Sequence, residues 1–195
     1  MTPASAPPPI ELRETVEEEA PAFLELILRN RDFLEPFEPR RPDGWFTLDA
    51  VRNELARADR DRRSDSAFAF GIWELESGSL VGRIALTNVA RGAWQNATLG
   101  YFVDQQRGRR GYATWAVREA LAFAFGWANL HRVQAGVMPR NLPSIRVLEK
   151  NGFRHEGLAQ RYVRVNGTWE DHQIYAMTAE EWEAARERRP VPEAR

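Results

Sequence analysis

The sequence predicts a mixed α/β fold of the α+β type, in which helices flank a largely antiparallel sheet. Two early segments space their apolar residues at helical intervals, and three β-rich runs separated by turn-like residues follow over 67–103. A strand, a basic glycine-containing loop and a helix then succeed one another up to about residue 127. The 195 residues match the size of one domain with a core of its own.

Helices are expected in both early segments. Over 15–34 the apolar residues recur at helical spacing, and Thr15 with Glu18 forms the pattern of a capping box. A second helix is expected from Leu48 to Ala58, after a Pro-rich stretch, with a charged face opposite its apolar one.

Strands and helices alternate in the rest of the chain. An antiparallel meander is predicted by the runs AFAFGIWEL, SLVGRIALTNV and ATLGYFV. A helix to about Trp127 is indicated by one apolar face that begins at Ala113. The next elements are a strand in HRVQAGVM, a short helix ending at Asn151-Gly152 and a hairpin turning at Asn166-Gly167.

Composition excludes several chemistries. The chain has no Cys, and of its 27 basic residues only Lys150 is Lys. A cysteine nucleophile, a disulfide framework and a thiolate metal site are therefore excluded. Schiff-base catalysis is disfavoured because Lys150 lies at an expected helix end. The net charge of −1 gives no general attraction to nucleic acid or to an anionic membrane.

The two ends are expected to be disordered tails. Residues 1–9 and 188–195 are poor in apolar side chains, which leaves 10–187 as a single domain. No apolar stretch has the length of a membrane span, and the start lacks the pattern of a signal peptide. We therefore expect a cytoplasmic protein without membrane contact, direct nucleic-acid binding or a metal.

The segment from Arg107 to Ala113 is a candidate anion site. Small residues stand where the chain turns into a helix, whose free N–H groups and dipole favour phosphate or pyrophosphate. Arg107, Arg109 and Arg110 add planar donors that suit phosphate oxygens. The segment matches neither a Walker A motif nor G-x-G-x-x-G, so by itself it also fits a plain basic surface loop.

Five segments together resemble the GNAT acyltransferase superfamily: LGYFVD, GYATWAVREAL, HRVQAGVMPRN, NLPSIRVLEKNGF and NGTWEDH. Within it the chain is most similar to the RimJ/RimL group of ribosomal-protein N-terminal (alanine/serine) acetyltransferases, and the likeness runs from about Glu11 to Trp182. The resemblance implies a GNAT domain over 10–187. Its sheet is expected to have about seven strands, mostly antiparallel, splayed in the middle and flanked by helices.

The resemblance implies acetyl-CoA as the cofactor. Backbone amides of the basic loop would hold its pyrophosphate, and the strand before the loop would pair with pantetheine across a cleft that it forms with the strand beginning near Arg132. The implied cofactor-binding residues are Tyr101, Phe102, Val103, Arg107, Gly108, Arg109, Arg110, Gly111, Tyr112, Ala113, Asn141 and Ser144.

One position of the loop departs from the family. The family usually has Gly where Arg109 stands and a polar residue where Gly108 stands. A positive φ at Arg109 costs about 1–2 kcal/mol. We therefore expect a shifted loop in which Gly108 takes over the turn and cofactor binding is kept.

Asn141 and Ser144 match the family's N-x-x-S at the start of the short helix. The resemblance implies that Asn141 contacts pantetheine and that Ser144 protonates the departing thiolate. Helix capping is the structural alternative for both. Many members carry a Tyr acid at the position of Leu148, so Ser144 or water is left as the proton donor here.

The general base is less clearly marked. Thr98 and Val163 stand where some relatives have Glu. Glu156 is the first remaining candidate, with Asp171 and His172 behind it. An α-amino group has a pKa near 8 and needs only modest help to lose its proton. A solvated surface carboxylate is the alternative interpretation of Glu156.

The acceptor is expected on the side opposite CoA, between the early helices and the last hairpin. Trp45, Phe46, Tyr162 and Trp169 are candidate wall residues, with core or lid packing as the alternative.

Three functions remain open. The first is an N-acetyltransferase of a protein N-terminus, ribosomal or other. The second is an N-acetyltransferase of a small amine, such as an antibiotic, a polyamine or an amino acid. The third is a non-catalytic CoA-binding module associated with the ribosome. Fold resemblance does not choose the acceptor, and a homodimer is an open possibility.

Overall fold

One seven-stranded sheet organises the molecule. The computed structural model describes residues 8–187, and in it the strands are ordered β1-β2-β3-β4-β5-β7-β6. All neighbouring pairs are antiparallel except β4 and β5, which are parallel. The strands are β1 (Ile10–Glu14), β2 (Phe68–Glu74), β3 (Ser79–Ala90), β4 (Asn96–Val103), β5 (Arg132–Val137), β6 (Arg154–Val165) and β7 (Thr168–Thr178). The predicted fold class is confirmed.

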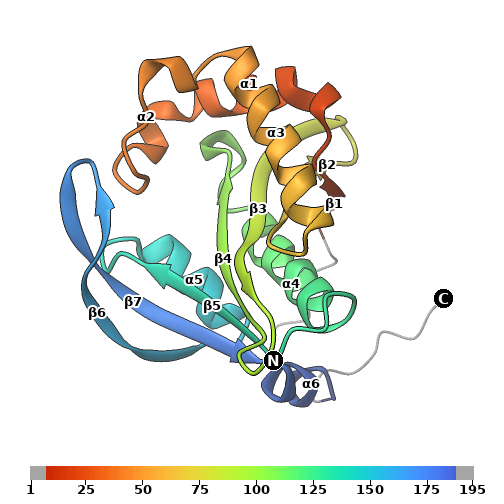
Figure 1. Cartoon of the computed structure of the whole chain (residues 1–195), viewed down its shortest axis with the longest axis vertical. Coiled ribbons are helices and arrows are strands. Elements are labelled where there is room, and N and C mark those ends of the chain that lie inside the picture. Colours follow the sequence, from red (N-terminus) through yellow and green to blue (C-terminus); the bar gives the residue numbers. More distant parts are fainter. Residues whose placement is uncertain (1–7, 188–195) are drawn as a thin grey trace.

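Helices cover both faces of this sheet. The α-helices are α1 (Ala20–Arg29), α2 (Arg31–Leu34), α3 (Leu48–Arg63), α4 (Tyr112–Phe125), α5 (Leu142–Lys150) and α6 (Ala179–Glu187). The 3-10 turns are η1 (Glu17–Glu19), η2 (Asp43–Trp45) and η3 (Gln105–Arg107). In Figure 1, α1, α2 and α3 gather at the upper end, while the long β6–β7 hairpin lies to the left.

The first predicted helix starts later than its pattern suggested. β1 continues the sheet to Glu14, and the Thr15 N–H donates to the Ala69 carbonyl. A 3-10 turn follows, and α1 begins only at Ala20, with a proline in its first turn. No side chain caps either element, so the capping box of Thr15 and Glu18 is wrong. Pairing with β2 outweighs the local helical signal.

The second predicted helix runs further than expected. Thr47 caps α3 by accepting a hydrogen bond from the Ala50 N–H. The helix continues five residues past Ala58 because charged partners take over from the apolar stripe: Asp59 pairs with both Arg62 and Arg63.

The core forms two clusters on opposite faces of the sheet. The larger contains α4, whose Ala116, Val117, Ala120 and Leu121 are fully buried. The smaller joins α1 and α3 to Trp73 of β2. Helix α4 ends at Phe125, two residues before the expected Trp127, because Gly126 leaves the helical conformation.

The second half of the chain follows the prediction closely. Both turn residues of the hairpin, Asn166 and Gly167, have positive φ angles, which suits a two-residue hairpin loop. Helix α5 ends at Asn151, and Gly152 after it has φ 84°. Strand β1 and helix α6 lie at the two ends of the described chain and were not predicted from pattern.

The predicted tails fall mostly outside the described residues, which exclude 1–7 and 188–195. Pro9 belonged to the predicted N-terminal tail, but its carbonyl accepts a hydrogen bond from the Leu75 N–H at 2.8 Å, so it extends the pairing of β1 with β2. Among residues 8–187, no helix has the length and apolar character to cross a membrane.

Candidate functional site

The sheet opens between its two parallel strands. β4 and β5 are paired only at Asn96–Thr98 with Arg132–Gln134, although both strands continue beyond this point. β4 stays paired with β3 as far as Val103, so only its other edge is left without a strand partner. The expected splay in the middle of the sheet is present. Unpaired backbone groups at such an edge need partners of their own.

A tyrosine and a serine meet at the gap. The Tyr101 hydroxyl of β4 lies 2.9 Å from the Ser144 Oγ of α5, and it also donates to the Ser144 carbonyl at 3.2 Å. Burial raises the pKa of Tyr101 to about 12, while the hydrogen bond with Ser144 opposes the rise. The phenol therefore stays protonated over the ordinary pH range.

Asn141 has a structural role at the start of α5. Its side-chain oxygen accepts a hydrogen bond from the Ser144 N–H at 3.2 Å, so Asn141 caps the helix. Leu148 is fully buried in the core one turn beyond Ser144. The capping alternative from the sequence is thus observed for Asn141, and it leaves the Ser144 hydroxyl at the gap.

The basic loop enters α4 through two residues with positive φ. Arg109 has φ 63° and Gly111 φ 83°, whereas Gly108 has φ −60°. The expected shift of the turn to Gly108 is therefore wrong. Gly108 is extended because it leaves the preceding 3-10 turn η3, and the left-handed position falls one residue later. Arg109 carries the strain that a glycine would avoid.

The start of α4 is open. Gly111 is its N-cap, and no side chain caps the helix. The first helical hydrogen bond runs from the Trp115 N–H to the Gly111 carbonyl, so the N–H groups of Tyr112, Ala113 and Thr114 precede the helical ladder. A Cβ atom built on Gly111 would meet no other atom within 4 Å. This end of the helix offers free donors to an anion.

Two of the three loop arginines pair with a buried carboxylate. Arg107 and Arg110 lie 3.3 and 3.5 Å from the carboxylate of Glu74, which is only 5% exposed. Tyr112 also donates to Glu74 at 2.6 Å, and this hydrogen bond is the main reason why the Glu74 pKa is lowered. Sequence inspection missed Glu74 because it stands far from the loop in the chain. Within 8–187, Arg109 is the loop arginine without an ion pair.

The beginning of the loop is tied to α1. The buried carboxylate of Asp104 accepts a hydrogen bond from Arg29 Nε at 2.7 Å. The side-chain oxygen of Asn30, which is fully buried, accepts from the Gln105 N–H at 2.9 Å. These contacts were not predicted, since the two segments are about 75 residues apart in sequence.

A cavity of about 210 Å³ lies beside the open strand. It is lined by Ile27, Leu34, Glu38, Arg41, Trp45, Arg83, Ala85, Thr87, Gly100, Tyr101 and Phe102. An adjoining cavity of about 190 Å³ shares Glu38, Arg41 and Trp45, and it adds Phe46 and Asn166.

Two of the four predicted wall residues belong to these cavities. Trp45 lines both and Phe46 the adjoining one, and the two rings meet edge to face at 5.1 Å. Tyr162 and Trp169 line neither, and their exposed fractions are 46% and 59%. The structure therefore does not bring all four together. Trp45 and Phe46 also pack on the smaller core cluster.

The turn of the β6–β7 hairpin borders the adjoining cavity through Asn166. Asn166 at the hairpin turn donates to the Glu35 carbonyl at 2.6 Å, and Arg140 donates to the Pro36 carbonyl at 3.1 Å. Arg140 is itself paired with Glu170 of β7. Figure 1 shows the hairpin tip beside the segment that follows α2.

Comparison with known proteins decides the family. The model of the acetyltransferase (GNAT) domain matches residues 10–154. The chain belongs to the GNAT acetyltransferase family.

Relatives and solved structures agree with this assignment. The chain is 41% identical to the probable N-acetyltransferase YjcK of Bacillus subtilis, over 87% of this chain and 91% of the relative. It is 32% identical to the [ribosomal protein uS5]-alanine N-acetyltransferase of Escherichia coli, over 80% and 81%. Mycobacterium smegmatis RimJ in complex with CoA-disulfide matches at TM-score 0.84 and 34% identity, covering 88% and 83% of the two chains.

The GNAT assignment makes the chain an acyltransferase that uses acetyl-CoA and an amine acceptor, and it favours an enzyme over the non-catalytic module. The residues present suit this cofactor. A long, anionic and amide-bearing molecule requires free N–H donors for its phosphates and an unpaired strand edge for its amides. The start of α4 and the edge of β4 that faces β5 provide them.

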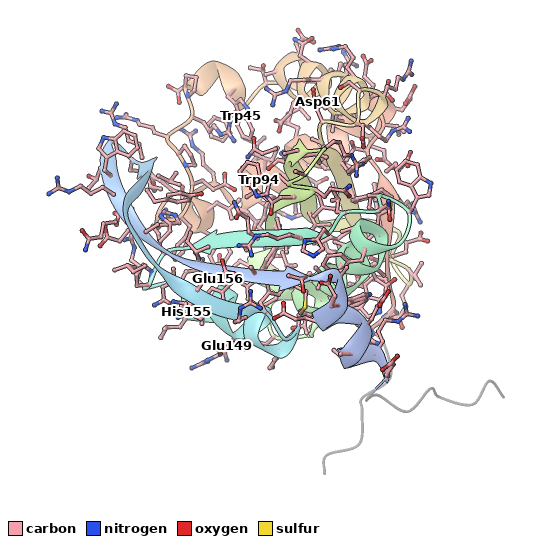
Figure 2. All side chains as sticks on the ribbon, turned by 60° about the horizontal axis from the view of Figure 1, so that its bottom comes forward. Trp45, Asp61, Trp94, Glu149, His155 and Glu156 are labelled. Carbon is pink, nitrogen blue, oxygen red and sulfur yellow. The ribbon has the colours of Figure 1, made fainter. Side chains whose placement is uncertain are left out.

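Glu156 is held by two arginines. Arg132 contacts it at 2.5 Å and Arg154 at 2.9 Å, and the hydrogen bond from Arg132 is the first cause that lowers the Glu156 pKa to about 2. Figure 2 shows Glu156 beside His155 on the outer strands, away from Trp45. A carboxylate with such a low pKa is a weak proton acceptor, which argues against Glu156 as the general base.

The two lower-ranked candidates for the general base also form hydrogen bonds within the hairpin. Asp171 accepts a hydrogen bond from the Arg161 N–H at 2.8 Å. His172 is buried, with Nδ1 3.0 Å from the Glu170 carbonyl. Both act within the hairpin.

Replacing Arg109 by Gly tests the strained turn. Arg109→Gly should raise the free energy of unfolding by about 0.5–1 kcal/mol, because glycine adopts positive φ without the steric cost. The same change should weaken acetyl-CoA binding several-fold if the unpaired guanidinium meets the phosphates. Chemical denaturation and titration calorimetry measure the two effects, with Arg109→Lys as the control that keeps charge and strain. Loss of stability in the Gly variant would contradict the strain.

Replacing Glu156 by Gln tests its structural role. Its pKa is about 2 in the folded protein against 4.5 ordinarily, so its ion pairs stabilise the fold above pH 4.5 and this stabilisation is lost as the pH falls toward 2. Glu156→Gln should lower stability by about 1 kcal/mol at pH 7, and the difference should vanish near pH 2–3. The control is Glu183→Gln at an exposed position of α6. A flattened acid limb in the rate profile of Glu156→Gln would instead restore it as the base.

Proposed function

We propose that this chain transfers the acetyl group of acetyl-CoA directly to the N-terminal α-amino group of a protein, a ribosomal protein in the first instance. The observation that carries the proposal is the gap between β4 and β5, with the open start of α4 at one end and a cavity beside it. The similarity to the uS5-alanine N-acetyltransferase of E. coli supports the choice of acceptor.

The donor lies along β4 and the start of α4. The backbone amides from Arg109 to Ala113 hold the pyrophosphate, and Arg109 supplies the free cation of the loop. Arg107 and Arg110 position the loop without contacting the pyrophosphate, because their ion pairs with Glu74 fix the shape of the loop. The open edge of Tyr101–Val103 receives the pantetheine amides. Asn141 holds the start of α5 at the same gap.

Acetyl-CoA supplies an acetyl group activated as a thioester. Ser144 provides the proton for the sulfur, and the Tyr101 phenol, 2.9 Å from Ser144 Oγ, returns a proton to the serine. The raised pKa of Tyr101 suits a group that must stay protonated until the thiolate forms. This pair takes over the task of the tyrosine that many family members carry at the position of Leu148.

A small-molecule amine is the second candidate acceptor. Both cavities are modest in volume, and Arg31, Arg40, Arg41 and Arg83 line them. Guanidinium groups suit a carboxylate, so a free amino acid is the small amine that the site fits best.

An acceptor panel separates these functions. The purified protein is incubated with acetyl-CoA and peptides that begin with Ala or Ser, their N-acetylated forms, free amino acids and polyamines. Release of CoA thiol is measured, undisturbed because the chain has no Cys, and products are located by mass spectrometry. We expect turnover with the free Ala and Ser peptides and none with the blocked ones. Turnover of amino acids alone would replace the protein acceptor by the small-amine one.

Two substitutions test the proton donor. Ser144→Ala and Tyr101→Phe should each lower kcat by about 10²-fold at unchanged acetyl-CoA affinity, because both interrupt one proton path. The double variant should lose little more than either single one, since the two groups act as a unit. Tyr175→Phe is the matched control, because it removes another buried phenol that bonds to Gln173 of β7. Additive losses would contradict a shared path.

A further inference from the structure

Glu38 stands at the junction of the two cavities and has no assigned role. It follows α2, and its N–H donates to the Leu34 carbonyl at 3.1 Å, which fixes the backbone at this point. The residue is half-buried and lines both the cavity beside β4 and the adjoining one. No pattern in the Pro-rich sequence around it marks it as functional.

The carboxylate of Glu38 has no partner among residues 8–187, whereas two other carboxylates near it are paired. Glu54 binds Arg83 at 2.6 Å, and Asp43 lies 3.0 Å from Arg31. Among residues 8–187, no side chain or backbone group makes a hydrogen bond or an ion pair within 4 Å with the Glu38 carboxylate. A half-buried carboxylate without a partner is costly unless something else binds it.

The surroundings of Glu38 shift its proton affinity upward. Burial is the first cause and raises its pKa, while the positive charges of Arg41 and Arg83 lower it and the negative charge of Glu54 raises it. The adjoining cavity adds four further charged side chains, those of Arg31, Glu35, Arg40 and Asp43. The net effect is a raised Glu38 pKa, which makes its carboxylate a better proton acceptor than a solvated one.

The opposite wall of the same cavity is the open strand. Gly100, Tyr101 and Phe102 of β4 line it, and a Cβ atom built on Gly100 would meet no other atom within 4 Å. A cavity of about 210 Å³ therefore separates Glu38 from the strand edge assigned to the donor. An amine that enters it meets the carboxylate of Glu38, and the hydroxyl groups of Tyr101 and Ser144 lie across the gap, on the other face of the sheet from Phe102.

We propose that Glu38 binds the acceptor amine and acts as the general base of the transfer. Its carboxylate pairs with the acceptor in the ammonium form, and it suits a cationic primary amine. This inference rests on the proposed acyl transfer and names the group that the sequence left open.

The proton balance closes with the groups present. Glu38 takes the first proton from the ammonium group, so the nitrogen lone pair becomes free. The nitrogen bonds to the thioester carbonyl carbon, and the carbon–sulfur bond breaks with its electron pair on sulfur. Ser144 protonates the sulfur and is reprotonated from Tyr101, which regains a proton when the nitrogen loses its second one. Glu38 releases its proton to water after the amide leaves.

Glu38→Gln is the test, with Asp32→Asn as the matched control. Glutamine keeps the size of the side chain and removes its charge. Asp32 is an exposed carboxylate of the neighbouring α2 that lines neither cavity. Each protein is assayed from pH 5.5 to 9.5 with an acceptor that the wild type turns over, and acetyl-CoA affinity and thermal stability are measured alongside.

The expected result is a pH-dependent defect. In the wild type, kcat/KM should be bell-shaped, because the reaction needs ionised Glu38 and a cationic amine. In Glu38→Gln it should fall about 10²-fold at pH 7, and the defect should shrink above pH 8, where an α-amino group is already neutral. Glu38→Asp should recover part of the activity. Acetyl-CoA affinity should stay unchanged, stability should stay equal or rise slightly because Gln removes an unpaired charge, and Asp32→Asn should match the wild type throughout.

Two results would overturn the inference. One is a Glu38→Gln profile that parallels the wild type at every pH. The other is a loss that is uniform in pH and accompanied by weakened acetyl-CoA binding, which would mark a structural role. If the wild type itself turns over no amine although it binds acetyl-CoA, the proposed function fails, and this outcome is visible before any variant is made.

Discussion

The separation of β4 from β5 after three paired residues is the constraint on which the rest of the structure depends. A parallel pair that continued would satisfy its own backbone groups and leave no room for a ligand. The gap is tolerable because each strand keeps its other neighbour: β4 stays with β3 to Val103, and β5 with β7 to Val137. Side chains bridge the gap where the backbone does not, through the contact of Tyr101 with Ser144.

Buried charge shapes the loop that leaves this gap. Glu74 holds Arg107, Arg110 and Tyr112 from inside the molecule, and Asp104 holds the start of the loop to α1 through Arg29. Both carboxylates are nearly inaccessible to water. The arginines that pair with them are therefore held in fixed positions and are not simply solvated surface charges. The loop cations thus divide into two that position the backbone and one, Arg109, that has no ion pair within residues 8–187.

The acceptor side is assembled from segments far apart in the chain. The segment after α2 provides Glu38 and Trp45, β3 and β4 provide the floor, and the hairpin turn at Asn166 ties the assembly to the far edge of the sheet. The hydrogen bonds from Asn166 and Arg140 to the Glu35 and Pro36 carbonyls hold the segment that carries Glu38 against the hairpin.

Local chemistry explains what the sequence by itself determined. The strand, loop and helix around Gly111, the end of α5 at Gly152 and the hairpin turn at Asn166 each depend on residues a few positions apart, and the set of family motifs could therefore be found by inspection. Tertiary contacts decided the rest. Because β1 pairs with β2, helix α1 begins later than predicted. The buried Glu74 pairs with two arginines that were predicted to bind phosphate. Glu156 forms ion pairs with arginines. That Glu38 has no partner in the described part of the chain is visible only in the folded structure, because desolvation and charge pairing depend on the folded neighbourhood rather than on the sequence.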